Sequence, residues 1–288
     1  MAAENLDTVF INGEFLPSKE AKVSAFDRGF IFGDGIYEVV PVINSRLVDR
    51  EGFWHRFERS LDQIELKLPY DKEKFEEILY EIISRNALKE GGIYMQITRG
   101  AAPRDFYFIE NLTPSVFIFC YEASVIDNPL AKSGIEIVSV PDIRWKRRDI
   151  KSVSLLAQCY AKNEAHKKGT YEGFMVEDGY VTEGCSSSAF IIKDKTLITK
   201  PLSNEILPGI RRKKLLNLAR EVGLKVEQRK FSMQEVYDAD EAFISAATLI
   251  LLPVIKADGK LINGGRIGEF APKLRELYAK DMLKEAGL

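Results

Sequence analysis

The stretch "RDIKSVSLLAQCYAKNEAHKKG" (148–169) decides how this chain is interpreted. It places Lys151 after a short extended segment and directly before an amphipathic helical pattern. Most lysines of a globular protein are solvated, and this chain has 41 Lys and Arg residues. Lys151 is therefore either one more surface lysine or a nucleophile, and the rest of the sequence has to decide between these two interpretations.

The composition limits the classes of function. A chain of 288 residues can bury a substantial core, in two moderate domains or one large one. The formal net charge of -2 gives no sign of binding to nucleic acid or to an anionic membrane. The short basic clusters "KRR" (146–148) and "RRKK" (211–214) are expected to form solvated faces or local ion pairs.

Cysteines, histidines and the N-terminus indicate the compartment. The three cysteines are odd in number and form no C-x-x-C motif, which argues against a disulfide scaffold and favours a reducing compartment. The two histidines, His55 and His166, offer little for a zinc site or a Ser-His-Asp triad. "MAAENLDTVF" (1–10) lacks the pattern of a signal peptide, and no apolar run is long enough to cross a bilayer. We expect a cytoplasmic protein without a metal.

The first half predicts a small α+β domain over residues 1–123. Apolar and alternating stretches predict an antiparallel sheet, and two helical patterns predict helices on one of its sides. The predicted strands are 8–17 (a hairpin turning at Asn12-Gly13), 36–43, 46–48, 92–100 and 115–123, and the predicted helices are 51–66 and 72–87.

The second half predicts a larger domain over residues 135–288, after an interdomain linker at 124–134 that is rich in turn residues. The predicted strands are 135–141, 171–178, 188–194, 223–230 and several within 243–262. The predicted helices end near 168, begin near Gly209, and span about 268–286.

Two stretches of the second half offer groups that could bind an anion or a cofactor. In "VTEGCSSSAF" (181–190), Glu183 is expected at a strand end, followed by the hydroxyl and N–H groups of Ser186 and Ser187. In "ILPGIRRKKLLNLAREVG" (206–223), a Pro-Gly pair leads into an amphipathic helix, whose first N–H groups have no partner within the helix. Taken alone, the first stretch is also consistent with an ordinary turn, and the second is more simply an ordinary helix start.

Two stretches of the first half add further groups. Arg56 and Arg59 lie three residues apart in "FWHRFERSL" (53–61), on one face of a predicted helix. In "FDRGFIFGDGIYEVV" (26–40), a Gly-Asp-Gly turn is followed by Tyr37 at the beginning of a strand. Taken alone, these are solvated arginines and a common turn.

Together these parts fit one chemistry. A lysine that forms a Schiff base needs a dry pocket that lowers its pKa. Pyridoxal phosphate needs a phosphate site made from a helix N-terminus, hydroxyls and an arginine, and a carboxylate beside its pyridine nitrogen. Lys151, Glu183, the Ser186/Ser187 loop, the helix start at Gly209–Arg211 and Arg56 supply each of these parts.

Several motifs resemble the fold-type IV pyridoxal phosphate family: "GDGIYEVV", "ITRGAAPR", "DIRWKRRDIKS", "VTEGCSSS" and "ILPGIRR". The resemblance covers about residues 8–280. The family includes branched-chain aminotransferases, D-amino acid aminotransferases and aminodeoxychorismate lyase, and the D-amino acid aminotransferases are the most similar. The resemblance implies a small α+β domain, a larger pseudo-barrel domain, and a homodimer whose active sites are completed across the interface.

The resemblance also implies roles for individual residues. Lys151 corresponds to the lysine that forms the Schiff base and moves the proton, and Glu183 corresponds to the glutamate at the pyridine nitrogen. Arg56 corresponds to the arginine at the phosphate. The remaining positions expected around the cofactor are Ser186, Ser187, Gly209, Ile210, Arg211, Ala247 and Thr248.

Substrate positions follow in the same way. Tyr37 corresponds to the active-site tyrosine, and Arg104 to an arginine that holds the substrate carboxylate from the neighbouring subunit, which a guanidinium can do bidentately. Phe106 stands where the family has a histidine, which removes one donor and would admit bulkier or more apolar substrates. Arg211 stands where the family has a threonine, and it would either contact the phosphate or point to solvent. The "SAAT" loop (245–248) has alanines where hydroxyl residues are common.

We therefore expect a D-amino acid aminotransferase. It would transfer the amino group of a D-amino acid to a 2-oxo acid, 2-oxoglutarate or pyruvate, by a ping-pong mechanism. A branched-chain L-aminotransferase, an (R)-amine transaminase and, third, aminodeoxychorismate lyase are alternatives on the same scaffold. The alternative from a different class is a non-catalytic binding protein, which would stay colourless when supplied with cofactor.

Overall fold

The computed structural model describes residues 5–288, so the first four residues of the N-terminal stretch lie outside the described part. The chain divides into two compact units. The first unit contains the described chain up to Val125, together with Ile150–Ser154 and Met282–Leu288. The second unit contains Ile126–Asp149 and Leu155–Asp281. The domain boundaries and the linker expected from the sequence stay a prediction.

The first unit is built on a six-stranded antiparallel sheet with the order β2-β1-β6-β5-β3-β4. Its hairpin turns at Asn12 and Gly13, which both have positive φ, as predicted for an Asn-Gly turn. The elements of this unit are β1 (Asn5–Ile11), β2 (Glu14–Pro17), α1 (Arg28–Phe32), β3 (Gly35–Ile43), β4 (Arg46–Leu47), α2 (Arg50–Gln63), α3 (Lys72–Arg85), β5 (Glu90–Thr98) and β6 (Ser115–Glu122).

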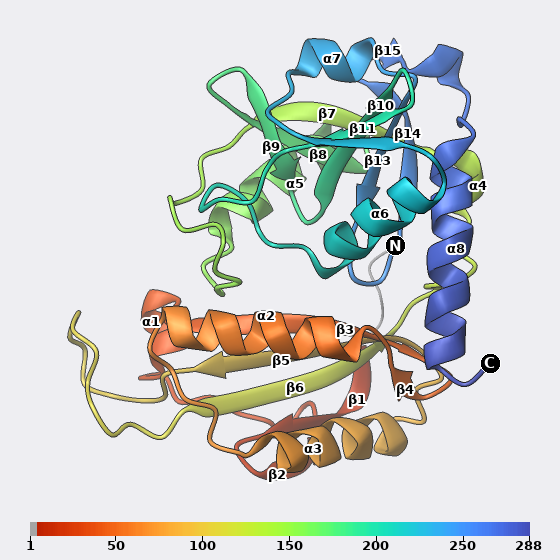
Figure 1. Ribbon diagram of the computed structural model, residues 1–288. Coiled ribbons are helices and arrows are strands. Elements are labelled where there is room, and N and C mark those ends of the chain that lie inside the picture. Colours follow the sequence, from red (N-terminus) through yellow and green to blue (C-terminus); the bar gives the residue numbers. More distant parts are fainter. Residues whose placement is uncertain (1–4) are drawn as a thin grey trace. The chain divides into compact units, whose positions relative to one another are not determined.

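Figure 1 labels the two long helices of the first unit, α2 and α3. Aromatic side chains of α2 and α3 pack against each other. The ring of Phe75 stacks on that of Phe57 with centroids 5.5 Å apart, and Trp54 meets the same ring edge-on. Asp71 caps α3 by accepting a hydrogen bond from the backbone N–H of Lys74 at 2.7 Å. The α+β arrangement expected for the first half is confirmed.

The second unit is built on a mixed nine-stranded sheet with the order β12-β11-β10-β13-β14-β7-β8-β9, and β15 pairs with β14. The sheet curls, so that β9 returns to contact β10, as expected for a pseudo-barrel. Its elements are α4 (Leu130–Ser133), β7 (Ile135–Pro141), α5 (Leu156–Lys167), β8 (Glu172–Glu177), β9 (Tyr180–Gly184), β10 (Ser188–Lys193), β11 (Thr196–Thr199), α6 (Ile210–Glu221), β12 (Lys225–Gln228), α7 (Met233–Tyr237), β13 (Glu241–Ser245), β14 (Leu252–Ala257), β15 (Lys260–Leu261), η1 (Asn263–Gly265) and α8 (Phe270–Glu285).

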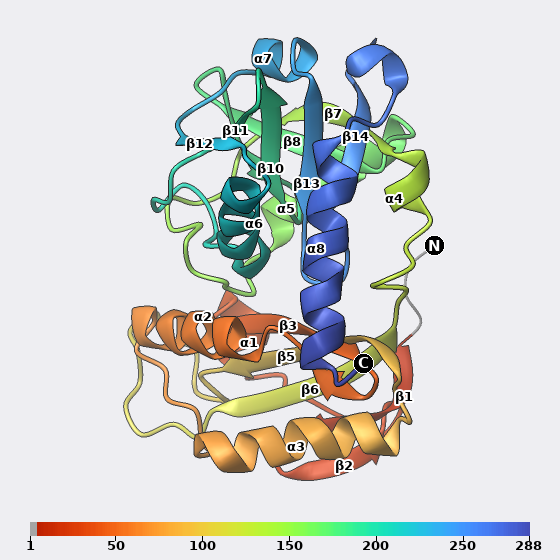
Figure 2. The same ribbon diagram turned by 45° about the vertical axis from the view of Figure 1, so that its right-hand side comes forward.

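Two helices of the second unit position the segments discussed below. Figure 2 shows α6 and α8 running next to each other. An ion pair between Lys214 and Asp281, with Nζ and Oδ2 3.0 Å apart, joins them. The N-terminus of α8 is fixed by the buried Glu241, whose carboxylate accepts from the backbone N–H groups of Phe270 and Ala271, both at 2.8 Å.

Candidate active site

Lys151 lies in the first unit, against β3. Its carbonyl oxygen accepts from the backbone N–H of Tyr37 at 2.9 Å, and Ser152 forms a bridge with Ile36. Its Nζ lies 4.1 Å from the centroid of the Tyr37 ring. Among the described residues this ammonium makes no ion pair and no hydrogen bond. The structure thus presents a half-buried amine that no carboxylate neutralises, with the predicted active-site tyrosine directly beside it.

Glu183 lies in the second unit, near the end of β9, and its side chain is buried. Nη1 of Arg144 donates to Oε1 in a buried ion pair, and the backbone N–H of Leu207 lies 3.3 Å from both carboxylate oxygens. Burial raises the pKa of Glu183 above the ordinary carboxyl range, and Arg144 opposes that rise. The carboxylate therefore has one charged partner and one weakly held amide.

A network that the sequence analysis missed holds Arg144 in place. Its Nε and Nη2 donate to Asp142 at 3.0 and 2.7 Å, and the hydroxyl of Thr182 donates to Asp142 at 2.6 Å. Burial tends to raise the pKa of Asp142, but the hydrogen bonds and charge of Arg144 lower it below its usual range. The signal in the sequence was the Asp-x-Arg spacing in "DIRW", which brings both side chains to one turn. Arg148 adds an ion pair to the same carboxylate, with atoms 3.2 Å apart.

Arg56 is buried in the first unit and forms a bidentate ion pair. Its Nε and Nη2 donate to the two carboxylate oxygens of Glu38, both at 2.7 Å. Glu38 follows Tyr37 on β3, so the pair orients the arginine from the strand that carries the tyrosine. Glu38 was not among the residues expected from the sequence, because its partner lies 18 residues away on a different element.

The two serines after Glu183 differ in their partners. The hydroxyl of Ser186 donates to the buried carboxylate of Glu172 at 3.0 Å. The hydroxyl of Ser187 is buried and has no hydrogen-bond partner within residues 5–288, and the same is true of Ser245 at the end of β13. Buried hydroxyls normally have partners. Ser187 is therefore the hydroxyl of this loop that a bound ligand could engage.

The start of α6 completes this part of the second unit. Gly209 is its N-cap, and no side chain caps the helix. A Cβ atom at Gly209 would lie 2.7 Å from Oγ of Ser188 at the beginning of β10, so a larger residue there would require the Ser188 side chain to move. Among the described residues, the backbone N–H groups of Ala247 and Thr248 donate to no acceptor. These donors and the cradle at Gly209 fit the phosphate of the expected cofactor.

Arg211 does not point to solvent, so the "RRKK" cluster does not form a solvated face throughout. Its side chain is buried, with 4% exposure; Nη1 donates to the hydroxyl of Tyr278 at 3.1 Å and Nη2 to the carbonyl oxygen of Ala247. Arg212 is also buried and donates to the carbonyl of Lys200 at 2.8 Å. The expectation of a solvated face was wrong for these two residues, because neutral acceptors of the fold satisfy their guanidinium groups.

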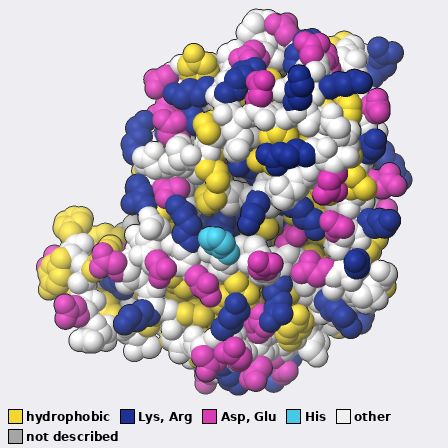
Figure 3. All heavy atoms as spheres, viewed as in Figure 1, with side chains coloured by type: hydrophobic (Ala, Val, Ile, Leu, Met, Phe, Trp, Pro, Cys, Tyr) yellow, Lys and Arg dark blue, Asp and Glu magenta, His cyan; other side chains and the backbone are white. Residues whose placement is uncertain are grey.

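Arg104 and Phe106 lie on the loop between β5 and β6. The guanidinium carbon of Arg104 lies 5.1 Å from the centroid of the Phe106 ring, which is 74% exposed. Tyr107 and Phe108 are exposed beside it. Figure 3 shows hydrophobic side chains gathered on a lobe at the left, where Figure 1 places this loop. Exposed aromatic groups of this kind are typical of a surface that meets another protein.

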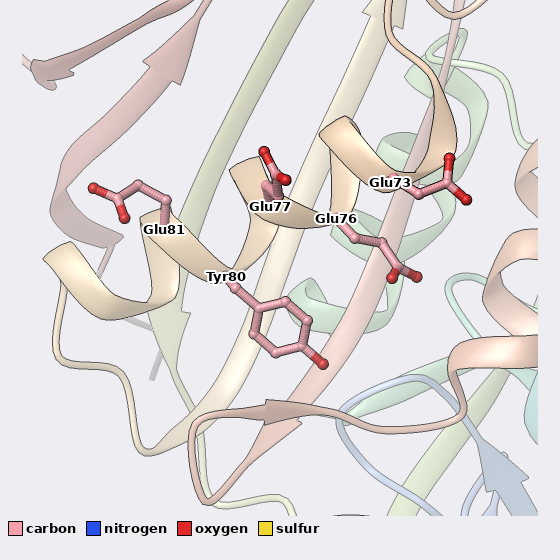
Figure 4. A pocket seen from close by; sticks show the side chains of 5 residues that line it. All are labelled: Glu73, Glu76, Glu77, Tyr80 and Glu81. Atoms are coloured by element: carbon pink, nitrogen blue, oxygen red, sulfur yellow. The ribbon is translucent and has the colours of Figure 1, made fainter.

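Other features lie outside this site. Figure 4 shows a hollow on α3 lined by Tyr80 and four glutamates, of which Glu76 accepts from Arg50 and from the indole N–H of Trp54 at 2.6 Å. Within residues 5–288, no helix is long and apolar enough to span a bilayer. The same described part of the chain contains no cluster of His, Cys, Asp or Glu suited to a metal ion.

Comparisons with known proteins identify the family of the chain. The family model for amino-transferase class IV matches residues 35–257. A D-alanine aminotransferase from Staphylococcus aureus (strain N315) is 39% identical over 279 residues, which are 96% of this chain and 98% of the relative. A D-alanine aminotransferase from Bacillus licheniformis is 33% identical, with the same coverage of both chains.

Solved structures with the same fold are more distant in sequence. The branched-chain amino acid aminotransferase of Escherichia coli has a TM-score of 0.87 at 22% identity, covering 96% of this chain and 95% of that one. A hypothetical aminotransferase from Mycobacterium tuberculosis, in its PLP-bound form, has a TM-score of 0.82 at 20% identity, covering 96% and 99%. The predicted fold is confirmed, and the chain belongs to the class IV aminotransferases, which are pyridoxal phosphate enzymes.

Proposed function

We propose that this chain is a D-amino acid aminotransferase that passes the amino group of a D-amino acid to a 2-oxo acid, 2-oxoglutarate or pyruvate. The similarity to two D-alanine aminotransferases over nearly the whole chain supports the substrate class. The observation that carries the chemistry is the buried Glu183 carboxylate. Arg144 occupies one of its oxygens and Leu207 makes only a long contact, so an oxygen remains for a second cationic partner.

The proposal gives Lys151 and Glu183 the two ends of one cofactor. When bound, pyridoxal phosphate supplies an aldehyde carbon for an amine and a conjugated ring that accepts an electron pair. Lys151 Nζ would hold the aldehyde end and then carry the proton removed from the substrate Cα. Glu183 would keep the pyridine nitrogen protonated. Tyr37, whose ring lies against the amine, would shape the space beside it.

The phosphate would bind where the second unit offers donors without acceptors. These are the N–H groups of Ala247 and Thr248, the hydroxyl of Ser187, and the start of α6 at Gly209 and Ile210. Arg56 belongs to the same proposal, as a guanidinium whose orientation the bidentate pair with Glu38 fixes.

The substrate carboxylate would be bound by Arg104 from the neighbouring subunit of a homodimer. The exposed aromatic residues of the loop that carries Arg104 support such an interface. Phe106, in place of a histidine, would leave the carboxylate with fewer donors and favour apolar substrates. We also propose a cytoplasmic location, which the unpaired thiols of Cys120, Cys159 and Cys185 support.

The visible spectrum of the cofactor-loaded protein tests the proposal. Addition of D-alanine should bleach the yellow absorbance, whereas L-alanine and L-leucine should leave it unchanged. Lys151→Ala should abolish the yellow absorbance and the turnover. Bleaching by L-leucine alone would contradict the substrate class and favour a branched-chain aminotransferase. A Lys151→Ala variant with normal turnover would contradict the mechanism.

Arg104→Ala distinguishes the carboxylate site from the alternatives. Its activity with D-alanine should fall, while binding of the cofactor, followed by absorbance, stays unchanged. Unchanged activity with D-alanine would mean that Arg104 does not bind the substrate carboxylate, and the D-amino acid assignment would then lose its main support in the sequence. Release of pyruvate without any amino acceptor would indicate a lyase. Light scattering should give the mass of two chains.

A further inference from the structure

The loop between β13 and β14 (246–251) is held from two sides by buried arginines. We propose that Arg211 and Arg275 form a clamp that positions the backbone N–H groups of Ala247 and Thr248 for the phosphate of the cofactor. The inference rests on the proposed function, because it takes this loop as part of the phosphate site. It assigns Arg211 a positioning role, in place of direct contact with the phosphate.

Arg211 forms the first side of the clamp. It is the second residue of α6, and its two terminal nitrogens donate to the carbonyl oxygen of Ala247 and the hydroxyl of Tyr278. Tyr278 is fully buried on α8, and its ring centroid lies 5.0 Å from the guanidinium carbon. A charged donor on a buried carbonyl is a strong contact. Arg211 therefore ties the loop to the start of α6 and to α8 together.

Arg275 forms the second side. It lies one turn before Tyr278 on α8, and its side chain is buried. Its Nη1 donates to the carbonyl oxygens of Leu249 and Leu251, at 2.5 and 2.8 Å, and its Nη2 donates to that of Ile126 at 2.9 Å. One guanidinium thus fixes two carbonyls of the loop, on either side of Ile250.

The residue between these carbonyls is strained. Ile250 has a φ of 56°, in the left-handed region that a β-branched residue rarely adopts. Such a conformation persists only where the surrounding structure imposes it. The two contacts of Arg275 flank this residue, and they supply that constraint. The clamp therefore maintains a backbone path that the loop sequence alone disfavours.

The clamp matters because the loop has few other ways to bind an anion. Two of its residues before Thr248 are alanines, so backbone N–H groups have to supply most of the donors. Those of Ala247 and Thr248 lack acceptors among the described residues. Hydrogen bonds to a phosphate require that the donors converge, and the carbonyl of Ala247, held by Arg211, belongs to the same short turn.

Titration of the cofactor-free protein with pyridoxal phosphate and with pyridoxal, which lacks the phosphate, separates the phosphate site from the rest. Arg211→Met should lower the affinity for pyridoxal phosphate about tenfold and leave that for pyridoxal unchanged. Arg275→Met should act in the same direction. Arg220→Met, which removes an exposed arginine from the far end of α6, is the matched control and should change neither affinity.

A wild-type ratio of the two affinities in Arg211→Met, or an equal loss of both, would overturn the inference. If Arg211→Met does not fold, Tyr278→Phe is the second variant, because it removes one acceptor of Arg211 and keeps the contact with Ala247. It should lower the ratio of the affinity for pyridoxal phosphate to that for pyridoxal by a smaller factor. Arg211→Lys can keep one of the two contacts, so its ratio of the two affinities should lie between those of Arg211→Met and the wild type. If the wild-type protein forms no yellow adduct with either compound, the proposed function fails first, and the clamp fails with it.

Discussion

The described part of the chain contains two buried glutamate–arginine pairs, one in each unit, and they are built differently. In the first unit, Glu38 and Arg56 share two parallel hydrogen bonds of 2.7 Å. In the second, Arg144 gives Glu183 only one N–H, because its Nε and Nη2 donate to Asp142. The first pair satisfies its carboxylate, whereas the second leaves Glu183 able to accept another cation.

Under the proposed function, the difference separates a group that supports the fold from one that takes part in the chemistry. A buried bidentate pair keeps both charges compensated, and removing one partner leaves an uncompensated charge. Glu183 is compensated only in part, and burial raises its pKa. A carboxyl group whose pKa is shifted, and which has an oxygen left to bind another partner, is typical of a functional site. Each of the following predictions tests whether the two pairs differ in this way.

The largest expected effect is on turnover in Glu183→Gln. An amide cannot keep the pyridine nitrogen protonated, so kcat should fall by a factor on the order of 10²–10³. Steady-state kinetics with D-alanine measure the change. The free energy of unfolding should change little, because Gln is an isostere and Arg144 keeps its two bonds to Asp142. A stable variant with wild-type kcat would remove Glu183 from the mechanism.

Glu38→Gln should have the next largest effect, and on stability. It leaves the buried Arg56 without its carboxylate, which costs about 3–5 kcal/mol of the free energy of unfolding. Urea unfolding of the cofactor-free protein measures this loss. Glu77→Gln breaks an exposed pair with Lys74 on α3 and serves as the control, with no measurable change expected. A Glu38→Gln protein as stable as this control would show that the two pairs do not differ.

The pH dependence of stability gives a smaller effect with a definite sign. A carboxyl whose pKa is raised by folding binds more protons in the folded chain, so its contribution to stability is lost as the pH rises between the unfolded and the folded pKa. In Glu183→Gln this carboxyl is absent, so the variant does not lose stability in this way as the pH rises. Its thermal midpoint, relative to wild type, should therefore rise as the pH increases above about 4.3. Glu241, whose pKa burial also raises, is present in both proteins and cancels. A constant difference across this range would mean that burial does not perturb Glu183.

The smallest expected effect concerns the cysteines: Glu183→Gln should expose no additional reactive thiol. Burial raises the pKa of Cys185, two residues after Glu183, to about 12, and that of Cys120 also to about 12, whereas Cys159 is exposed. One thiol should react per native chain, both in wild type and in Glu183→Gln. A second reactive thiol in the variant would show that the loop has opened, and the loss of turnover would then have a structural cause.

Local patterns predicted most of the secondary structure. The hairpin at Asn12-Gly13, both long helices of the first unit and the helix after Gly209 lie where the sequence placed them. The strands β9 and β11 and the helices α1 and α7 were missed, because segments of four or five residues are too short to show a periodicity. β9 carries Glu183, so its position at a strand end was expected although the strand was not listed among the predicted strands.

The residues of the candidate site also differ in how far local sequence patterns could predict them. Lys151, Glu183 and the helix start at Gly209 could be proposed from the sequence because each occurs in a short motif with a recognisable local pattern. Arg211 was expected to contact the phosphate or point to solvent, but it lies under α8. Its partner Tyr278 is 67 residues away in the sequence. A helical pattern alone does not reveal which distant residues the helix will contact.

The sequence by itself determined the fold class and the family and supplied the candidate reactive side chains, because these depend on patterns and motifs within short stretches. The tertiary structure alone decided which charges pair. Glu38 lies 18 residues from Arg56, and Arg144 lies 39 residues from Glu183. The energy of a buried charge depends on the few ångströms to its partner and on the loss of water, and only the folded chain sets both.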